Sequence, residues 1–299
     1  MQRLLIICGP TATGKTALAL SLAKKLNGEI VSADSKQVYR GLDIGTGKDV
    51  PPGVKIWGYD LVGPKEEFSV SEYVTLAQSR LEKILKEGKL PILVGGTGLY
   101  IKAIVDGIPT VRVPKNNNLR KNLVEKSAEE LFELLAQVDP IKAGSLNASD
   151  KKNPRRLVRA LEIATWKLEG KKLKPKGVSY KTLFIGLTAP KRLLFRRIGE
   201  RVQGRLAAGL EAEIKSLLDA GVTWDDQAMS SLGYRQWRGF FENKKSKIDV
   251  VKEWTHQERK YAKRQITWFK TDARINWFDI TKPQWQKKVE FMVKRWYSS

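Results

Sequence analysis

The sequence predicts an α/β fold: a P-loop-type three-layer core with a parallel sheet, plus an inserted all-helical domain. Apolar runs without polar alternation recur between helical patterns in the first hundred residues, which is typical of parallel strands buried on both faces. A complete phosphate-binding motif follows the first of these runs. Long stretches later in the chain show helical periodicity only, and these stretches predict the insertion.

The core elements are expected in alternation. The predicted strands are Leu4–Cys8, Glu29–Ser32, Pro91–Val94, Thr182–Leu187 and Ile275–Ile280, and the predicted helices are Thr16–Leu26, Ser69–Glu87 and Lys287–Trp296. Apolar residues recur every three or four positions in the second of these helices, and Gly88 ends it. Further helices are expected over Leu119–Val138 and Arg155–Lys167. We therefore assign residues 1–114, about 180–201 and 263–299 to the core, and about 115–179 and 202–262 to helical insertion segments.

The charge of the chain is high and uneven. The 299 residues carry 55 Lys and Arg against 32 Asp and Glu, a formal net charge of +23. Residues 1–100 hold 13 basic and 10 acidic side chains, so 42 basic and 22 acidic ones remain for residues 101–299. Eight of the nine tryptophans also lie in that second part. Such a composition indicates a polyanion-binding part beside a compact catalytic part, although solvated helix faces would give a similar count.

The composition excludes several classes of site. A single cysteine, Cys8, excludes an internal disulfide and any zinc or iron–sulfur site built from cysteines. A single histidine, His256, excludes a metal site with two histidine ligands. No apolar run approaches the roughly 18 residues of a membrane helix. We expect a cytoplasmic globular protein that does not bind a membrane.

The phosphate-binding motif has the form G-x-x-x-x-G-K-[ST]. It comprises Gly9, Pro10, Thr11, Ala12, Thr13, Gly14, Lys15 and Thr16. Its glycines allow several backbone N–H groups to point at one anion, and the following helix adds its N-terminal partial charge. Lys15 supplies a full positive charge, and the Thr16 hydroxyl can join the coordination shell of a phosphate-bound Mg²⁺. The motif predicts a diphosphate or triphosphate site without identifying what the phosphates carry.

An acidic residue stands at one predicted strand end. The strand Pro91–Val94 runs into Gly95-Gly-Thr-Gly98 without the carboxylate that many ATPases place there. Asp34 instead follows the strand Glu29–Ser32, at the sheet edge where open α/β folds bind ligands. Its carboxylate could serve as an indirect Mg²⁺ ligand, as a base facing the phosphates, or as a helix N-cap.

Several further segments accompany the phosphate-binding motif in a fixed order along the chain. The full set is Gly9–Thr16, Asp34-Ser-Lys-Gln-Val-Tyr-Arg-Gly41, Leu42–Thr46, Leu93-Val-Gly-Gly-Thr-Gly-Leu-Tyr100, Arg155–Glu162, Gly233-Tyr-Arg235 and Lys263–Phe269. Together these segments resemble the isopentenyl-diphosphate:tRNA transferase (IPP transferase) family, bacterial type. The resemblance implies transfer of a dimethylallyl group from dimethylallyl diphosphate to N6 of the adenosine 3′ of the anticodon, position 37 of tRNA. It implies that diphosphate is released, that Mg²⁺ is the cofactor, and that the anticodon stem-loop of tRNA is the partner. It also implies that the helical insertions bind tRNA. We expect a monomer.

The resemblance also implies roles for single residues. Asp34 would be the catalytic base, Thr97 would lie by the target nucleotide, and Arg201 or a neighbouring arginine would contact the diphosphate. Arg197, Arg201 and Arg205 share one helix face, which could instead be a solvated face paired with acidic residues. The glycines at 95, 96 and 98 would let the backbone approach the adenine closely. The residues expected at the tRNA are Asp34, Ser35, Lys36, Gln37, Thr97, Arg120, Arg155, Arg156, Leu157, Val158, Arg159, Gly233, Tyr234, Arg235, Lys263, Arg264 and Gln265.

Some of these segments have plainer interpretations. Arg155 and Arg159 are one helical turn apart and could both face phosphates, and Tyr234 could offer a stacking ring, but a surface helix or a core contact explains the same composition. We expect Trp268 and Phe269 to lie in the core. Asn116-Asn-Asn118 stands where the family has an Asp-Pro pair before the arginine equivalent to Arg120, and Gly45-Thr-Gly-Lys48 has a glycine where alanine is common. Alternative functions are an ATP-dependent nucleotide or small-molecule kinase, a prenyltransferase acting on free adenine nucleotides, and a P-loop RNA-binding protein without catalysis.

Overall fold

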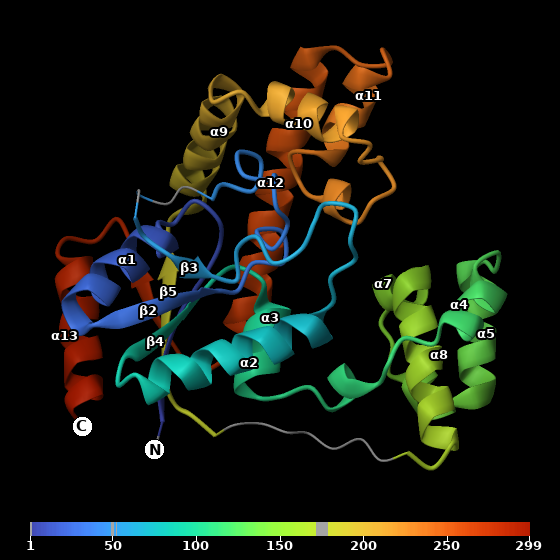
Figure 1. The fold of residues 1–299 in the computed structure, drawn as a ribbon, viewed down its shortest axis with the longest axis horizontal. Coiled ribbons are helices and arrows are strands. Elements are labelled where there is room, and N and C mark those ends of the chain that lie inside the picture. The colour runs from blue at the N-terminus through green and yellow to red at the C-terminus, as the bar shows by residue number, and fades with distance from the viewer. Residues whose placement is uncertain (1, 49–50, 52, 172–178) are drawn as a thin grey trace. The chain divides into compact units, whose positions relative to one another are not determined.

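The computed structural model describes residues 2–48, 51, 53–171 and 179–299. The chain divides into two compact units (Figure 1). The first comprises Met1–Asp106 and Val178–Ser299, and the second comprises Gly107–Gly177.

The first unit is built on a six-stranded sheet in which every pair of neighbours is parallel. Its strand order is β3-β2-β4-β1-β5-β6. The strands are β1 (Arg3–Cys8), β2 (Gly28–Ser32), β3 (Ile56–Trp57), β4 (Leu90–Val94), β5 (Lys181–Thr188) and β6 (Ile275–Asp279). Because all strands point the same way, the segments that follow β1, β2 and β4 meet at one edge of the sheet.

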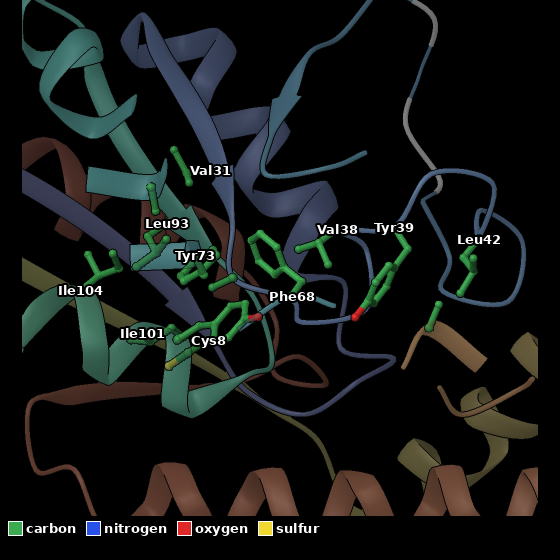
Figure 2. Close-up of a cluster of buried hydrophobic side chains, with 14 of the residues drawn as sticks. Cys8, Val31, Val38, Tyr39, Leu42, Phe68, Tyr73, Leu93, Ile101 and Ile104 are labelled. Carbon is green, nitrogen blue, oxygen red and sulfur yellow. The ribbon is translucent and has the colours of Figure 1, made fainter. Parts of the chain in front are cut away.

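Helices cover both faces of this sheet. Alternate residues of β1 belong to different core clusters: Leu4 and Ile6 pack with α2 (Val70–Lys86) and α3 (Gly98–Val105), whereas Leu5 and Ile7 pack with α1 (Lys15–Leu26) and α13 (Trp285–Ser298). Figure 2 shows part of the first cluster, where strand residues such as Leu93 lie beside Tyr73 of α2. The sheet is therefore the middle layer of three, as predicted.

The remaining helices of the first unit follow β5. They are α9 (Lys191–Ala207), α10 (Leu210–Asp219), α11 (Arg238–Phe241) and α12 (Lys247–Lys270), with short 3₁₀ turns at Ala228–Ser230 and Arg235–Trp237. Helices α9 and α12 pack on one another and both extend past the domain boundaries expected near residues 201 and 263. The second half of the chain thus returns to the same unit as the phosphate loop.

The second unit is helical and has its own core. After a 3₁₀ turn at Pro109–Arg112, its helices are α4 (Asn117–Leu123), α5 (Ala128–Val138), α6 (Pro140–Gly144), α7 (Ala148–Lys151) and α8 (Pro154–Leu168). Leu131, Leu135, Leu157 and Leu161 form the centre of its apolar cluster.

One expectation about elements was wrong, and one strand was not predicted. The single helix predicted over Leu119–Val138 is divided into α4 and α5, because Ser127 caps α5 in a reciprocal capping box with Glu130. The strand β3 was not predicted, since two residues show no periodicity.

Candidate active site

A cavity of about 260 Å³ opens at the carboxyl edge of the sheet in the first unit. The segments after β1, β2 and β4 line it together with α9, α12 and the segments 45–47 and 230–235. Six of its lining residues are cationic and two are acidic: Lys15, Lys36, Arg201, Arg205, Arg235 and Arg264 against Asp34 and Glu258. This excess of positive charge suits an anionic ligand.

The phosphate loop has the backbone geometry that its glycines predict. Gly9 has a φ of 127° and lies so close to the backbone of Leu187 that any Cβ would overlap it. Gly14, also left-handed, is the N-cap of the twelve-residue helix α1, and no side chain in the described structure caps that first turn. The first N–H groups of α1 are therefore available to an anion.

Lys15 lies within the loop in a strongly perturbed environment. Its Nζ donates a hydrogen bond of 2.7 Å to the carbonyl oxygen of Pro10. Burial, with a further contribution from the charge of Arg201, lowers the pKa of Lys15 to about 8, although the Asp34 carboxylate acts in the opposite direction. An anion bound here would restore the charged form of the lysine.

Two residues from helices much later in the chain form hydrogen bonds with the phosphate loop. Nη1 of Arg201 on α9 donates to the Thr11 hydroxyl at 2.8 Å, so the predicted arginine does lie against the phosphate loop. Gln265 on α12 accepts from the Thr11 N–H at 2.9 Å and donates to the Gly96 carbonyl at 3.0 Å. Gln265 thus ties the loop after β1 to the loop after β4.

Asp34 and Thr97 are brought together by backbone contacts between the ends of β2 and β4. The N–H of Thr97 donates to the Ala33 carbonyl at 3.1 Å, and the Thr97 hydroxyl accepts the N–H of Ser35 at 3.1 Å. Asp34 itself lines the cavity and accepts the N–H of Lys36 at 2.9 Å. Asp34 therefore lies at the cavity wall, and Thr97, which is not among the residues that line the cavity, is bonded to the segment that carries Asp34.

The three glycines around Thr97 make room for other parts of the protein. A Cβ at Gly95 would overlap the backbone of Ala33, one at Gly96 the amide of Gln265, and one at Gly98 the ring of Trp268. These glycines let protein atoms that shape the site pack closely, and the close approach to an adenine stays a prediction.

The cavity residues that were not expected at the site include Arg205 and the α12 residues Glu258 and Tyr261. The Tyr261 hydroxyl is hydrogen-bonded to Thr97, and burial raises its pKa, with a smaller contribution from Asp34. Glu258, Tyr261 and Gln265 follow the i, i+3, i+7 spacing of one helix face, and this spacing was the available signal.

Comparisons with known proteins identify the family of the chain. A sequence model of the IPP transferase family matches residues 37–272, and a model of isopentenyl transferases matches residues 2–56. The chain belongs to the IPP transferase family. It is 40% identical to the tRNA dimethylallyltransferase of Anoxybacillus flavithermus over 287 residues, covering 94% of this chain and 91% of that one.

Solved structures give the same result. The tRNA isopentenylpyrophosphate transferase of Bacillus halodurans is similar with a TM-score of 0.74 and 33% identity, covering 99% of this chain and 97% of that one. A eukaryotic dimethylallyltransferase acting on tRNA aligns with a TM-score of 0.78 and 25% identity, over 93% of this chain and 74% of that one. The predictions of the family, of its P-loop-type α/β fold and of a transferase are thereby confirmed.

The IPP transferase residues expected at the tRNA in the first unit fall into two groups. Lys36, Arg235 and Arg264 line the cavity, and Lys263 is exposed on α12. Gln37 also lines the cavity, but it is buried and donates to the Gly47 carbonyl at 3.2 Å. Gly233, with a φ of 90°, is packed against Trp254.

Tyr234 differs from its expected role as a stacking ring. Its side chain is fully buried, and its hydroxyl donates to Glu213 at 2.6 Å. Glu213 also accepts the N–H groups of Asp43 and Ile44, so Tyr234 helps to hold the 43–45 loop. Of the two aromatic residues expected in the core, Phe269 is buried but Trp268 is 47% exposed, so the expectation for Trp268 was wrong.

In the second unit, some of the predicted arginines are exposed and others are bonded within the protein. Arg155 and Arg156 are exposed, and Arg156 pairs with Asp150. Arg159 instead donates to the carbonyl oxygens of Thr110 at 2.8 Å and Val113 at 2.7 Å, and to buried Glu162 at 2.8 Å. Leu157 lies in the apolar core with Val158 packed against it.

Arg120 forms a salt bridge with the same buried carboxylate, that of Glu162. Its Nε donates to Glu162 at 2.7 Å. Burial raises the pKa of Glu162, but hydrogen bonds from Arg120 and Arg159 outweigh burial and lower it below the ordinary value. Asn116 caps α4, so the asparagine triplet still starts a helix ahead of Arg120.

Proposed function

We propose that this chain transfers the dimethylallyl group of dimethylallyl diphosphate to N6 of the adenosine 3′ of the anticodon in tRNA and releases diphosphate. The observation that carries the proposal is that the phosphate loop and Asp34, a carboxylate with Thr97 beside it, face one cationic cavity. The relatives with known structures or names act on tRNA with the same class of prenyl donor.

The phosphate loop binds and stabilises the leaving group. As the allylic C–O bond breaks, its electron pair goes to the diphosphate oxygen, and the extra negative charge develops next to the α1 N-terminus, Lys15 and Arg201. These groups are already in place, since Lys15 is held by Pro10 and Arg201 by Thr11. Stabilisation of this developing charge lowers the barrier for the allyl transfer.

Asp34 acts as the base. The N6 amine is a weak nucleophile because its lone pair is delocalised into the adenine ring. As the new C–N bond forms, the amine loses a proton, which a carboxylate oxygen of Asp34 accepts. Thr97 orients the amine through its hydroxyl, and Tyr261 orients Thr97 through the hydrogen bond between the two side chains.

The donor set also fits Mg²⁺. Thr16 and Asp34 line the same cavity as the phosphate loop, and a hydroxyl, a carboxylate and phosphate oxygens are ligands that this ion accepts while retaining several waters. Among the described residues there is no group of three or more His, Cys, Asp or Glu side chains for a purely protein-bound metal. The bound ion would neutralise charge on the diphosphate.

The anticodon stem-loop would be bound by cationic residues of both units. In the first unit these are Lys36, Arg235, Lys263 and Arg264, and in the second unit the exposed Arg155 and Arg156. No helix in the described part of the chain is long and apolar enough to cross a bilayer.

The test is the Asp34→Asn variant, which retains size and hydrogen bonding but removes basicity. We expect kcat for prenyl transfer from radiolabelled dimethylallyl diphosphate to fall roughly 10²-fold or more, with the tRNA Kd changed little. Asp225→Asn, at a side chain 90% exposed, is the matched control and should retain full activity. Near-wild-type turnover by Asp34→Asn would remove the assigned base.

A further inference from the structure

Two arginines on one face of α9 point into the cavity. Arg201 and Arg205 are one helical turn apart, and both line the site. Their guanidinium groups are neighbours above Gly47: a Cβ added there would lie 2.5 Å from Nη2 of Arg205 and closer still to Nη2 of Arg201. Gly47 has a φ of 68°, so both its backbone and its missing side chain allow this arrangement.

Arg205 is held in place by a buried acid. Nη1 of Arg205 lies 3.4 Å from Oε1 of Glu258, and the two side chains are only 11% and 10% exposed. Glu258 also accepts the indole N–H of Trp254 at 3.2 Å, which orients its carboxylate. Arg205 thus stands beside the Glu258 carboxylate, and the neighbouring Arg201 is bonded to the neutral Thr11 hydroxyl. The two arginines and the one acid leave a net positive charge at this wall of the cavity.

We propose that Arg205 is a second guanidinium ligand of the diphosphate, with Glu258 and Gly47 as its positioning residues. The proposal rests on the proposed function and extends it. Arg201 is anchored at Thr11 of the phosphate loop, and Arg205 stands beside it one turn further along α9. A diphosphate presents oxygens on two phosphorus atoms, and the planar donor forks of adjacent arginines match such a pair of phosphates.

Calorimetric titration of the full chain with inorganic diphosphate and MgCl₂ tests the proposal. We expect Arg205→Met to weaken diphosphate binding about tenfold or more, as for loss of a charge-assisted hydrogen bond. The Kd for tRNA should change less than about twofold. Arg196→Met removes the same charge from an α9 side chain that is 70% exposed, and it should bind diphosphate like the wild type.

Two further variants separate positioning from general stability. Glu258→Gln and Gly47→Ala should each weaken diphosphate binding, and the Gly47→Ala effect should shrink in the Arg205→Met background because one of the two crowded guanidinium groups is gone. If Arg205→Met does not fold, the diphosphate affinities of Glu258→Gln and Gly47→Ala test the role of Arg205 in its place: unchanged affinity in both would overturn that role.

The outcomes are distinct. A wild type that does not bind diphosphate would overturn the proposed function itself. A wild type that binds it, with Arg205→Met binding equally well, would overturn only the role of Arg205. Weakened tRNA binding with unchanged diphosphate binding would assign Arg205 to the RNA instead, and additive Gly47→Ala and Arg205→Met effects would reject the positioning role of Gly47.

Discussion

At the scale of single residues, the depressed pKa of Lys15 has a consequence for ligand binding. Burial and the charge of Arg201 place that pKa at about 8, so the free protein loses this proton as the pH rises through about 8. Only the protonated lysine attracts the anion, and binding must therefore take up a proton above that pH. We expect diphosphate affinity to fall about tenfold per pH unit above 8.

Two variants control for the ionisation of the ligand. Lys15→Met should bind weakly throughout and lack the extra fall above pH 8. Arg201→Gln should move the midpoint of the fall upward, because the cation that opposes protonation of Lys15 is gone. If the diphosphate affinities of Lys15→Met and the wild type fall in parallel with pH, the fall does not come from deprotonation of Lys15. The measurement is calorimetry at constant ionic strength.

Arg159 and Arg155 are expected to behave differently although they are one turn apart. Arg159→Ala removes donors from two carbonyl oxygens and from buried Glu162, so it should destabilise the second unit by about 1–3 kcal/mol. Arg155→Ala should leave stability unchanged and weaken tRNA binding. Hydrogen exchange of α8 and tRNA titration check the two effects, and equal stability of both variants would contradict the prediction.

The sequence predicts a site residue when a motif or an element end next to that residue marks it, but not when its partner comes from a distant part of the chain. Gly9–Thr16 and Asp34 adjoin strands, so a motif or a strand end identifies them. Arg205 and Glu258 are 53 positions apart, and only the packing of α9 on α12 makes them a pair. The role of Tyr234 stayed open between a stacking ring and a core contact, because a sequence does not show whether a ring beside a glycine turns inward or outward.

At the scale of elements, α12 is the part that joins the strand-end loops. Gln265→Leu removes both hydrogen bonds to the loops and should cost about 1–2 kcal/mol in stability, with a larger relative loss of diphosphate binding because the Thr11 N–H loses its acceptor. Gln203→Leu, at an exposed position of α9, is the matched control. Unchanged diphosphate affinity in Gln265→Leu, measured by calorimetry, would show that the loop keeps its shape without this bridge.

Element boundaries could be predicted where a local signal exists. The strands β1, β2, β4, β5 and β6 were expected within a few residues, because burial on both faces produces continuous apolar runs. The division between α4 and α5 also had a signal, the Ser127 and Glu130 pair of the capping box, but helical periodicity on either side obscured it.

At the scale of the whole molecule, the charge of +23 predicts strongly salt-dependent tRNA binding. Each neutralised phosphate contributes a slope of roughly 0.7–0.9 in log K against log salt. Arg155→Ala should reduce the total slope by about one unit, whereas Asp34→Asn should leave it unchanged. Filter binding across a salt series measures both slopes, and a flat wild-type slope would contradict the electrostatic contribution of the cationic residues.

The bridge made by Gln265 also bears on synthesis of the chain. Gln265 and Thr11 are 254 positions apart, so the phosphate loop emerges from the ribosome long before the amide that holds it. N-terminal segments fold first as a chain is made, and β1, β2 and β4 can associate early. Arg201 and Gln265 reach the loop only later, in that order. The site that we propose for the prenyl diphosphate therefore stays unfinished in a nascent chain until residue 265 has been synthesised.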